Sequence, residues 1–363
     1  MTKVLPTNAA RPVTVFAPDW SKSNPYQQRL RDSLEAAGIS IVFKDFPSNW
    51  LPLSKLRSSE SHVAVIHIHW IPALVGPVIW SRSKLRQTAK LFLLALDLAL
   101  VRLSGTRTVW TVHNLIEHES ANPLVERLAR RVIALLCNHI IVHSESAKRA
   151  VQKYYDLDIS SKTSVIRHGN YDGIYLPHPD RSAQVSKRID LDDNHVSILF
   201  FGHIRRYKGV ERLIEVFRKT SKSNLRLILA GKPYDDIAAS IRRQCATDSR
   251  IIPTLEFIPN NDVDAYFSLA DVVIIPFEKT LSSGSAVLAM TFGKALILPI
   301  HAKVLDLADE RGAFYFASDE ELFKLLQNLD KTQLKNMGRH NRKVANTFSW
   351  ETIAQATIRA YSV

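Results

Sequence analysis

The sequence predicts two α/β domains in tandem, each built on a doubly wound parallel sheet. Three observations lead to this prediction. The chain has 363 residues, a length that accommodates about two domains. Short apolar runs alternate with amphipathic stretches in both halves, a pattern typical of βαβ units. The apolar runs are continuous rather than alternating, which indicates strands covered by helices on both faces of a sheet.

The first half contains five apolar runs that we interpret as strands. They are Val13–Ala17, Ile39–Phe43, Val63–Trp70, Thr108–Val112 and His139–His143. Amphipathic stretches between several of them predict helices over Tyr26–Ala37, Lys84–Leu103 and Leu124–Cys137. The segment Tyr171–His195 is rich in Pro and Asp and has no hydrophobic period, so we expect it to be the interdomain linker.

The alternation of strands and helices restarts after this segment. The predicted strands are Val196–Phe201, Leu225–Ala230, Ile251–Ile258, Val272–Phe277 and Ala295–Ile300. The predicted helices are Val210–Thr220, Ile237–Cys245, Val263–Leu269, Ser285–Phe292 and a last helix, Trp350–Tyr361. Ligands of such sheets bind at the carboxyl ends of the strands. Because two domains of this kind face each other, we expect the site in a central cleft between them.

Composition limits the class of protein. Hydrophobic residues make up 46% and charged residues 23% of the chain, as in ordinary globular proteins. Two cysteines, Cys137 and Cys245, suit a reducing compartment rather than a disulfide framework. Residues 1–11 lack the apolar core of a signal peptide, and the longest apolar stretch, Leu91–Leu103, is too short to span a bilayer. We therefore expect a cytoplasmic protein.

The chain is strongly basic. Its formal net charge is +13, which favours anionic partners. Zinc-finger spacing, an RNP-type run and a basic region followed by heptads are all missing from the sequence, so nucleic acid is not expected as a partner. The basic segment Ser81–Arg107 has two interpretations. It is either a solvated surface over a core helix, or a peripheral contact with anionic lipid at the inner face of the plasma membrane.

The strongest candidate for chemistry is a basic loop at the start of the second half. An apolar strand ends at Gly202, a loop carries Arg205, Arg206 and Lys208, and a helix begins near Gly209. Fixed cations at a strand end are suited to neutralise a diphosphate, Arg by bidentate hydrogen bonds and Lys as a point charge. The alternative is a basic loop without a ligand.

A second candidate follows the predicted strand Val272–Phe277. Small residues precede a helix there, and small residues at a helix N-terminus expose backbone N–H groups to an anion, to which the helix dipole adds attraction. Together with the basic loop, they predict a turn that binds phosphate oxygens. The residues are Ser282, Ser283, Gly284 and Ser285.

These segments resemble the nucleotide-sugar domain of GT-B glycosyltransferases. The resemblance rests on FGHIRRYKGVERLIEVF, LRLILAGKP, ADVVIIPF and SSGSAVLAMTFGKALI, and more loosely on VIRHGNYDGIY and FSWETIAQATIRAY. It is greatest to the family 4 group and to related mannosyl- and glucuronosyltransferases of bacterial exopolysaccharide pathways. It implies a GT-B fold of two Rossmann-like domains, with acceptor binding in residues 1–180 and nucleotide-sugar binding in 181–345. It also implies that a C-terminal helix in 346–363 crosses back to the N-terminal domain.

The resemblance assigns roles to the basic loop. In the family, an Arg and a Lys of this loop bind the diphosphate, and these correspond to Arg205 and Lys208. The arginine that usually follows the loop glycine is replaced here by His203, so Arg205 or Arg206 must take its place.

The chain departs from the family at the sugar end. Two family glutamates, eight positions apart, contact the donor sugar and the ribose. The corresponding residues are Thr280 and Leu288, and neither is able to do the same work. Glu278 is the candidate replacement for the sugar contact. Whether the reaction retains or inverts the anomeric configuration is therefore open.

The catalytic candidates lie in the first half. His113, at the carboxyl end of a predicted strand, is positioned to meet the sugar or the diphosphate, and Glu117 and Asp19 are candidate general bases. A structural role at a strand end is the alternative for His113. A metal site of His113, Glu117 and His118 is disfavoured because the helical zinc spacing is missing. His168 is expected to touch the donor or to act in a hinge.

We therefore expect a glycosyltransferase of bacterial polysaccharide biosynthesis that needs no metal. The donor is a nucleoside-diphosphate sugar, GDP-mannose first and UDP-glucose or UDP-glucuronic acid second, and the acceptor is a glycan or a lipid-linked saccharide. A nucleotide-sugar epimerase of similar fold is the alternative. A two-lobed sugar-binding module is disfavoured by the basic loop, and a dinucleotide oxidoreductase by the lack of G-x-G-x-x-G.

Overall fold

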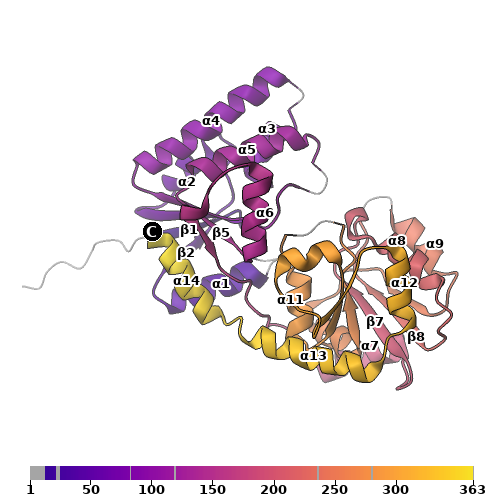
Figure 1. Cartoon of the computed structure of the whole chain (residues 1–363). Helices are drawn as coiled ribbons and strands as arrows, with labels where there is room; N and C mark the ends of the chain where they lie inside the picture. The colour runs from indigo at the N-terminus through magenta and orange to yellow at the C-terminus, as the bar shows by residue number, and fades with distance from the viewer. Residues whose placement is uncertain are drawn as a thin grey trace, which may run out of the picture. The chain divides into compact units, whose positions relative to one another are not determined.

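The computed structural model describes residues 13–21, 25–81, 83–117, 120–234, 237–278 and 281–362. The chain forms two compact units (Figure 1). The first consists of the residues up to Arg167 together with those from Trp350 onward, and the second of His168–Ser349. Each unit contains its own parallel sheet.

Among the described residues, the sheet of the first unit has six parallel strands in the order β2-β1-β3-β4-β5-β6. Five of them were predicted to within two residues at either end. The sixth, β6, has three residues, too few for a periodic signal. The strands are β1 (Val13–Ala17), β2 (Ser40–Phe43), β3 (Val63–Ile68), β4 (Arg107–Thr111), β5 (His139–Val142) and β6 (Thr163–Val165).

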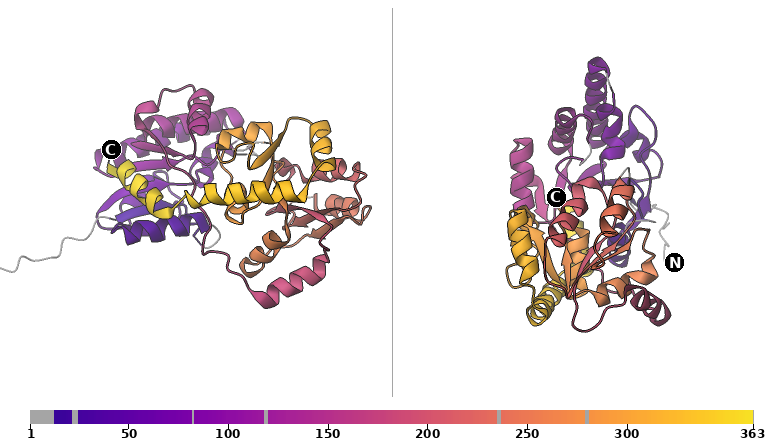
Figure 2. Two further views of the ribbon diagram at one scale, coloured as in Figure 1. Left: turned by 60° about the horizontal axis from the view of Figure 1, so that its bottom comes forward. Right: turned by 90° about the vertical axis from the view of Figure 1, so that its right-hand side faces the viewer.

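Helices connect these strands on both faces of the sheet. They are α1 (Pro25–Ala36), α2 (Pro52–Arg57), α3 (Pro72–Ile79), α4 (Lys84–Leu103), α5 (Pro123–Leu136), α6 (Glu145–Tyr155) and the C-terminal α14 (Trp350–Ser362). Helix α14 packs against α1, and the left view of Figure 2 shows the two helices beside each other. Its buried Trp350 and Ile353 share a hydrophobic cluster with Tyr26 and Leu30 of α1, so the end of the chain completes the core of the first unit.

A buried carboxylate sets the orientation of α4. Asp97 is fully buried. Its Oδ2 accepts a hydrogen bond of 2.7 Å from the backbone N–H of Leu53, and its Oδ1 one of 2.8 Å from that of Ser54. Asp97 therefore satisfies the free N–H groups at the start of α2. Burial raises the pKa of Asp97, while these hydrogen bonds oppose the shift. The contact turns the Asp97 side of α4 toward the core.

In the second unit, the described residues form six parallel strands in the order β12-β11-β10-β7-β8-β9. The strands are β7 (Val196–Phe201), β8 (Leu225–Ala230), β9 (Ile251–Thr254), β10 (Val272–Ile274), β11 (Ala295–Pro299) and β12 (Ala313–Phe316). The helices are α7 (Pro179–Ile189), α8 (Val210–Arg218), α9 (Ile237–Cys245), α10 (Asn260–Leu269), α11 (Gly284–Thr291), α12 (Asp319–Gln327) and α13 (Lys331–Asn346). Strand β12 and the bounds of α12 and α13 were not predicted from the sequence.

The linker prediction for Tyr171–His195 was wrong. Helix α7 lies within this segment, and Tyr171, Val185 and Ile189 belong to the hydrophobic core of the second unit. The helix was missed because two apolar residues four positions apart give too weak a period on an otherwise polar stretch. The units divide between Arg167 and His168 rather than at residue 180, because the chain packs into the second core from Tyr171 onward.

The predicted fold class is confirmed, since both units are α/β domains with parallel sheets. In each sheet the chain first builds outward in one direction and then returns to build in the other. The order reverses between β1 and β3 in the first unit, and between β7 and β10 in the second. Ligands of doubly wound sheets bind beyond the carboxyl ends of the strands at such a reversal. We therefore expect ligand-binding residues in the loops that follow β1, β3, β7 and β10.

Candidate functional site

The basic loop follows β7, directly at the reversal in the second unit. It is joined to the loop after β8, because the Ile204 N–H donates to the Lys232 carbonyl at 2.9 Å and the Tyr234 N–H donates to the Ile204 carbonyl at 3.0 Å. A one-turn 3-10 helix, Arg206–Lys208, completes the loop. Its cations are thus held on a backbone that the neighbouring strand supports.

Three cations gather on two aromatic rings at this edge. The Lys208 Nζ lies 4.9 Å from the ring centroid of Phe277. The Arg205 guanidinium carbon and the Lys232 Nζ lie 4.7 Å and 5.5 Å from the ring centroid of Tyr234. Such contacts position cations over the negative faces of the rings. Lys232 was not among the predicted site residues, although it lies in LRLILAGKP, directly after a strand and a glycine.

The electrostatics of this cluster suit an anion. Burial, and then the charge of Arg205, lower the pKa of Lys208 to about 8. Burial, and then the charges of Lys208, Arg205 and Lys232, lower the pKa of His203. Like charges disfavour one another's charged forms, and a bound anion would reverse both effects. The exposed Arg206 instead lies 4.0 Å from Glu211.

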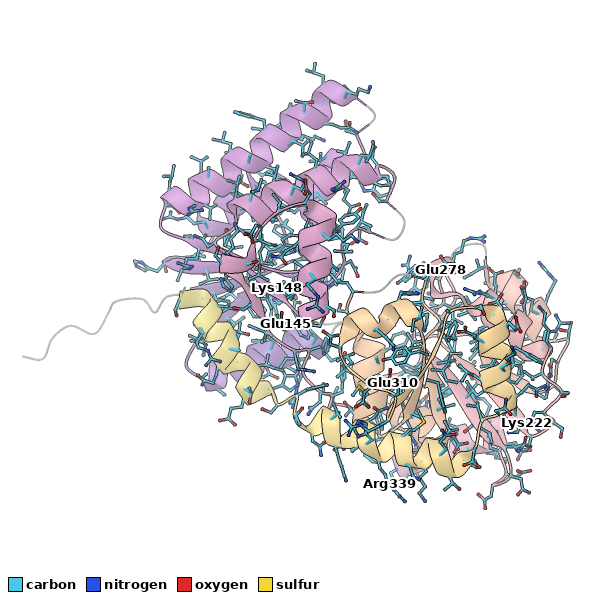
Figure 3. All side chains as sticks on the ribbon, in the orientation of Figure 1. Glu145, Lys148, Lys222, Glu278, Glu310 and Arg339 are labelled. Carbon is cyan, nitrogen blue, oxygen red and sulfur yellow. The ribbon has the colours of Figure 1, made fainter. Side chains whose placement is uncertain are left out.

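A close backbone approach brings the segment after β10 against this loop. Gly209 has φ +67°, and a Cβ on it would lie 2.6 Å from the Pro276 carbonyl oxygen. Only glycine fits there, on both conformational and steric grounds. The Glu278 N–H donates to the Tyr207 carbonyl at 3.0 Å, and the exposed Glu278 side chain lies at this edge of the sheet (Figure 3).

The predicted phosphate turn forms the start of α11. The Ser283 Oγ accepts a hydrogen bond of 3.2 Å from the Ala286 N–H, so Ser283 is the N-cap. A Cβ on Gly284 would lie 2.7 Å from the Tyr171 hydroxyl and 3.7 Å from the His168 Nε2. His168 thus packs on this turn as part of the second unit. Gly284 and Ser285 are the first residues of α11, where backbone N–H groups are suited to an anion. Ser282 directly precedes the N-cap.

Of the two positions that differ from the family glutamates, Leu288 and Thr280, the structure describes only Leu288. Leu288 is buried inside α11, so its side chain belongs to the core. Thr280 lies outside the described residues, which end at Glu278 and resume at Leu281.

Aromatic rings stack in a column at the reversal in the first unit. The Trp70 ring, after β3, stacks on His113, after β4, with centroids 4.6 Å apart and planes at 9°. The Trp20 ring, after β1, stacks in turn on Trp70, with centroids 4.6 Å apart and planes at 20°. His113 is buried, while Trp20 is 40% exposed. The column therefore runs from the interior to the surface.

Three further histidines pack beside the column. His67 and His69 have ring centroids 4.0 Å apart, and those of His113 and His143 are 5.3 Å apart. Burial lowers the pKa of His67 to about 3, and burial also lowers the pKa of His69 and His143. These three imidazoles are therefore neutral near pH 7.

His69 is the unusual member of this group. It is 1% exposed, and neither ring nitrogen has a hydrogen-bond partner in the described part of the chain. By contrast, His67 bonds the Tyr361 hydroxyl and the Thr111 hydroxyl, both at 2.8 Å. A buried donor or acceptor without a hydrogen bond costs about 1–3 kcal/mol. A water molecule or a ligand hydroxyl that bonds to the His69 ring would remove this cost. The run IHIHW at the end of a predicted strand was the sequence feature that could have identified His69 as a candidate site residue.

The two candidate bases occupy different surroundings. The Asp19 Oδ1 accepts hydrogen bonds from the Ser21 N–H at 3.0 Å and the Ser21 Oγ at 2.6 Å. Asp19 directly precedes Trp20, so it lies beside the aromatic column. The Glu117 Oε1 lies 3.4 Å from an Arg130 nitrogen, and Arg130 also pairs with the buried Glu126 at 2.6 Å.

The alternative metal hypothesis finds no support in the described ranges, where no group of three or more His, Cys, Asp or Glu side chains is arranged to hold a metal ion. His118, which that hypothesis required, lies outside them.

The chain is similar to known glycosyltransferases. Residues 195–329 match the family model "Glycosyl transferases group 1". A GDP-mannose:glycolipid 4-beta-D-mannosyltransferase of Xanthomonas campestris pv. campestris is 26% identical over 345 residues, which are 94% of this chain and 88% of that protein.

Solved structures show the same fold. Anabaena HepE in complex with UDP has a TM-score of 0.72 at 13% identity and covers 97% of this chain and 100% of its own. Sucrose-phosphate synthase from Thermosynechococcus elongatus has a TM-score of 0.75 at 15% identity, with coverage of 97% and 98%.

The pKa of Lys208 predicts a pH dependence of diphosphate binding. The protonated amine binds the anion, and this form predominates below pH 8 in the free protein. Affinity for a nucleotide sugar, whose diphosphate keeps its charge, should therefore fall roughly tenfold for each pH unit above 8. Calorimetric titration between about pH 6.5 and 9.5 measures this. Lys208→Arg keeps its charge throughout and should lose this dependence. An equal fall in both proteins would contradict the role of Lys208.

Proposed function

We propose that this glycosyltransferase of the GT-B fold, which carries a glycosyl transferases group 1 domain over residues 195–329, transfers mannose from GDP-mannose to a lipid-linked saccharide. The observation that carries the proposal is the cluster of Arg205, Lys208 and Lys232 at the strand reversal, which suits a diphosphate. The mannosyl donor and glycolipid acceptor come from the name of the Xanthomonas relative. UDP-glucose is the second donor candidate, since it appears bound in a structure of HepE.

The chemistry at the donor end is stabilisation of a leaving group. As the bond between the sugar and the diphosphate breaks, negative charge develops on the departing diphosphate. Arg205, Lys208 and the N–H groups at the start of α11 would receive it. Each such contact contributes roughly 2–4 kcal/mol in comparable anion sites. Protein cations and a helix terminus would thereby do the work that other transferases assign to a metal ion.

We propose further that the anomeric configuration is inverted. GDP-mannose is an α-glycoside, and the name of the Xanthomonas relative specifies a β-linked product. At the family's ribose glutamate, this chain has the buried Leu288. Inversion needs a general base for the acceptor hydroxyl. His113 and Asp19, at the two ends of the aromatic column, are the proposed bases, with Glu117 third because Arg130 engages its carboxylate.

The donor is tested by binding and transfer together. GDP-mannose should raise the melting temperature more than UDP-glucose or ADP-glucose, because a ligand that binds only the folded state stabilises it. With GDP-mannose and a polyprenyl-diphosphate oligosaccharide, Lys208→Ala should lower kcat/KM by roughly 100-fold. The exposed Lys187→Ala on α7 serves as the matched control. The one-bond carbon–proton coupling at the new anomeric carbon should report a β-linkage. Stabilisation by UDP-glucose alone would favour the second donor, and an α-linked product would overturn inversion.

The aromatic column offers a surface for the acceptor. Saccharide rings pack their C–H faces against exposed aromatic rings, and Trp20 presents 40% of its surface to solvent. The turn that carries it is held by the buried Gln27, whose Nε2 donates to the Pro18 carbonyl at 2.8 Å and whose Oε1 accepts from the Trp20 N–H at 2.9 Å. We propose that the acceptor saccharide stacks on Trp20.

Removal of the Trp20 ring should weaken the acceptor and leave the donor unaffected. Trp20→Ala should raise the acceptor KM roughly fivefold to tenfold, as expected for an aromatic contact of about 1–1.5 kcal/mol. The KM for GDP-mannose should not change, and Trp20→Phe should restore part of the loss. Phe257→Ala, an exposed ring of the second unit, is the matched control. A change in the donor KM alone would place Trp20 on the donor instead.

A lipid-linked acceptor would lie in a membrane, and we propose that α4 contacts this membrane. None of the described helices is long and apolar enough to cross a membrane. Yet the side of α4 opposite its buried face carries Leu85, Phe92, Leu96 and Leu103, all exposed and near one line along the helix. A helix with an apolar stripe on each side has a second apolar partner. The exposed Lys84, Arg86 and Arg102, which flank this stripe, favour anionic lipid headgroups.

The protein should therefore co-sediment with phosphatidylglycerol vesicles at low salt and much less with phosphatidylcholine vesicles. The double variant Phe92→Ser, Leu103→Ser should reduce binding at least tenfold, because two large apolar side chains would no longer enter the interface. Arg242→Glu with Arg243→Glu, exposed cations of α9, should bind as the wild type does. Equal sedimentation of the wild type and the α4 variant would remove α4 from the contact.

A further inference from the structure

A second basic site lies at the opposite end of the sheet in the second unit. It is a pocket of about 780 Å³. Asp271, immediately before β10, and Lys294, immediately before β11, line it, and α13 forms one wall. These are the amino ends of the strands, whereas the diphosphate cluster lies at the carboxyl ends. Figure 3 shows Arg339 of α13 and Glu278 at opposite edges of this unit.

The wall formed by α13 is a row of cations. They recur every four residues and so lie along one side of the helix. From the first to the last, at about 1.5 Å per residue, the row is roughly 18 Å long. Its members are Lys331, Lys335, Arg339 and Lys343.

The other charged residues that line the pocket are also mostly positive. Lys294 and Arg342 also line it, and Asp271 is the one acid among the described lining residues. Lys331 lies 3.7 Å from Asp271, so that acid is already engaged. Arg342 donates to Asp172 at 2.6 Å. Lys335, Arg339 and Lys343 are exposed to solvent.

This arrangement lowers stability unless an anion is bound. Like charges four residues apart destabilise a helix by about 0.2–0.5 kcal/mol for each pair, and the row on α13 contains three such pairs. Burial lowers the pKa of Lys294, which nearby Asp271 and Asp264 oppose. A ligand with several negative charges would relieve the repulsion along α13.

We propose that this pocket binds a phosphate-bearing ligand at a second site, separate from the diphosphate cluster of Arg205 and Lys208. Phosphates fit because their charge is concentrated and their oxygens accept hydrogen bonds from both Lys and Arg. The strand β11 has five residues, about 17 Å in length, so one diphosphate is too short to reach both ends of the sheet. The phosphates belong either to a soluble oligophosphate or to lipid headgroups.

Calorimetric titration of the full chain with inorganic pyrophosphate tests the second site. In the Lys208→Ala background, where the first site is disabled, pyrophosphate should still bind with one equivalent. Adding Lys335→Glu and Arg339→Glu should weaken this binding at least tenfold, and higher salt should weaken it further. Arg242→Glu with Arg243→Glu is the matched charge reversal on α9. Binding unchanged by the α13 reversal would overturn the site.

A vesicle arm distinguishes the two sources of phosphate. Phosphatidylglycerol vesicles are tested with the Phe92→Ser, Leu103→Ser protein, so that α4 does not contribute. Retained sedimentation that the α13 reversal abolishes, without pyrophosphate binding, assigns the site to lipid headgroups. Binding of neither probe overturns the proposal, whatever the outcome at Lys208. Should the double reversal unfold the protein, Lys335→Gln with Arg339→Gln should give a smaller loss in the same direction.

Discussion

The contact between Gly209 and the Pro276 carbonyl is the constraint on which the basic loop of the second unit depends. The backbone after β7 and the backbone after β10 meet there without an intervening side chain. This approach is what carries Lys208 over Phe277 and ties Glu278 to Tyr207. A residue with a Cβ at position 209 would separate the two loops and move Lys208 away from Phe277.

The joined loops bring several cations to one edge of the sheet. Arg205, Lys208 and Lys232 share two aromatic rings, which stabilise cations without cancelling their charge. The lowered pKa of Lys208 reports the resulting repulsion together with burial. A bound anion would stabilise the charged forms of all three cations at once. The three cations lie within residues 195–329, which match the glycosyl transferases group 1 model.

The strand reversal of the first unit is lined by neutral rings rather than by cations. Its strand reversal gathers imidazole and indole rings, and burial keeps His67, His69 and His143 uncharged. A neutral imidazole has one N–H donor and one nitrogen acceptor, so it is able to orient a hydroxyl by hydrogen bonding. The unmade hydrogen bonds of His69 mark the part of this unit where a polar group is still required.

Most strands and helices could be predicted because their signals are local. The apolar runs of β7 and β8 and the helix Lys84–Leu103 were located to the residue. Arg205 and Lys208 were found because they follow a strand within one short stretch. Helix α7 was not predicted, since its two buried apolar residues carry almost no periodic information. Strand β12 was not predicted either.

The sequence by itself determined the alternation of strands and helices, the two-domain organisation and the basic loop, because each depends on residues adjacent in the chain. Only the tertiary structure decided which separate segments meet. Lys232 joins Lys208 because β8 pairs with β7, and Trp20 reaches His113 through Trp70 because β3 lies between β1 and β4. Strand order is set by packing over the whole sheet. For the same reason, α13 faces the amino ends of β10 and β11, where its row of cations lines a pocket rather than a solvated surface.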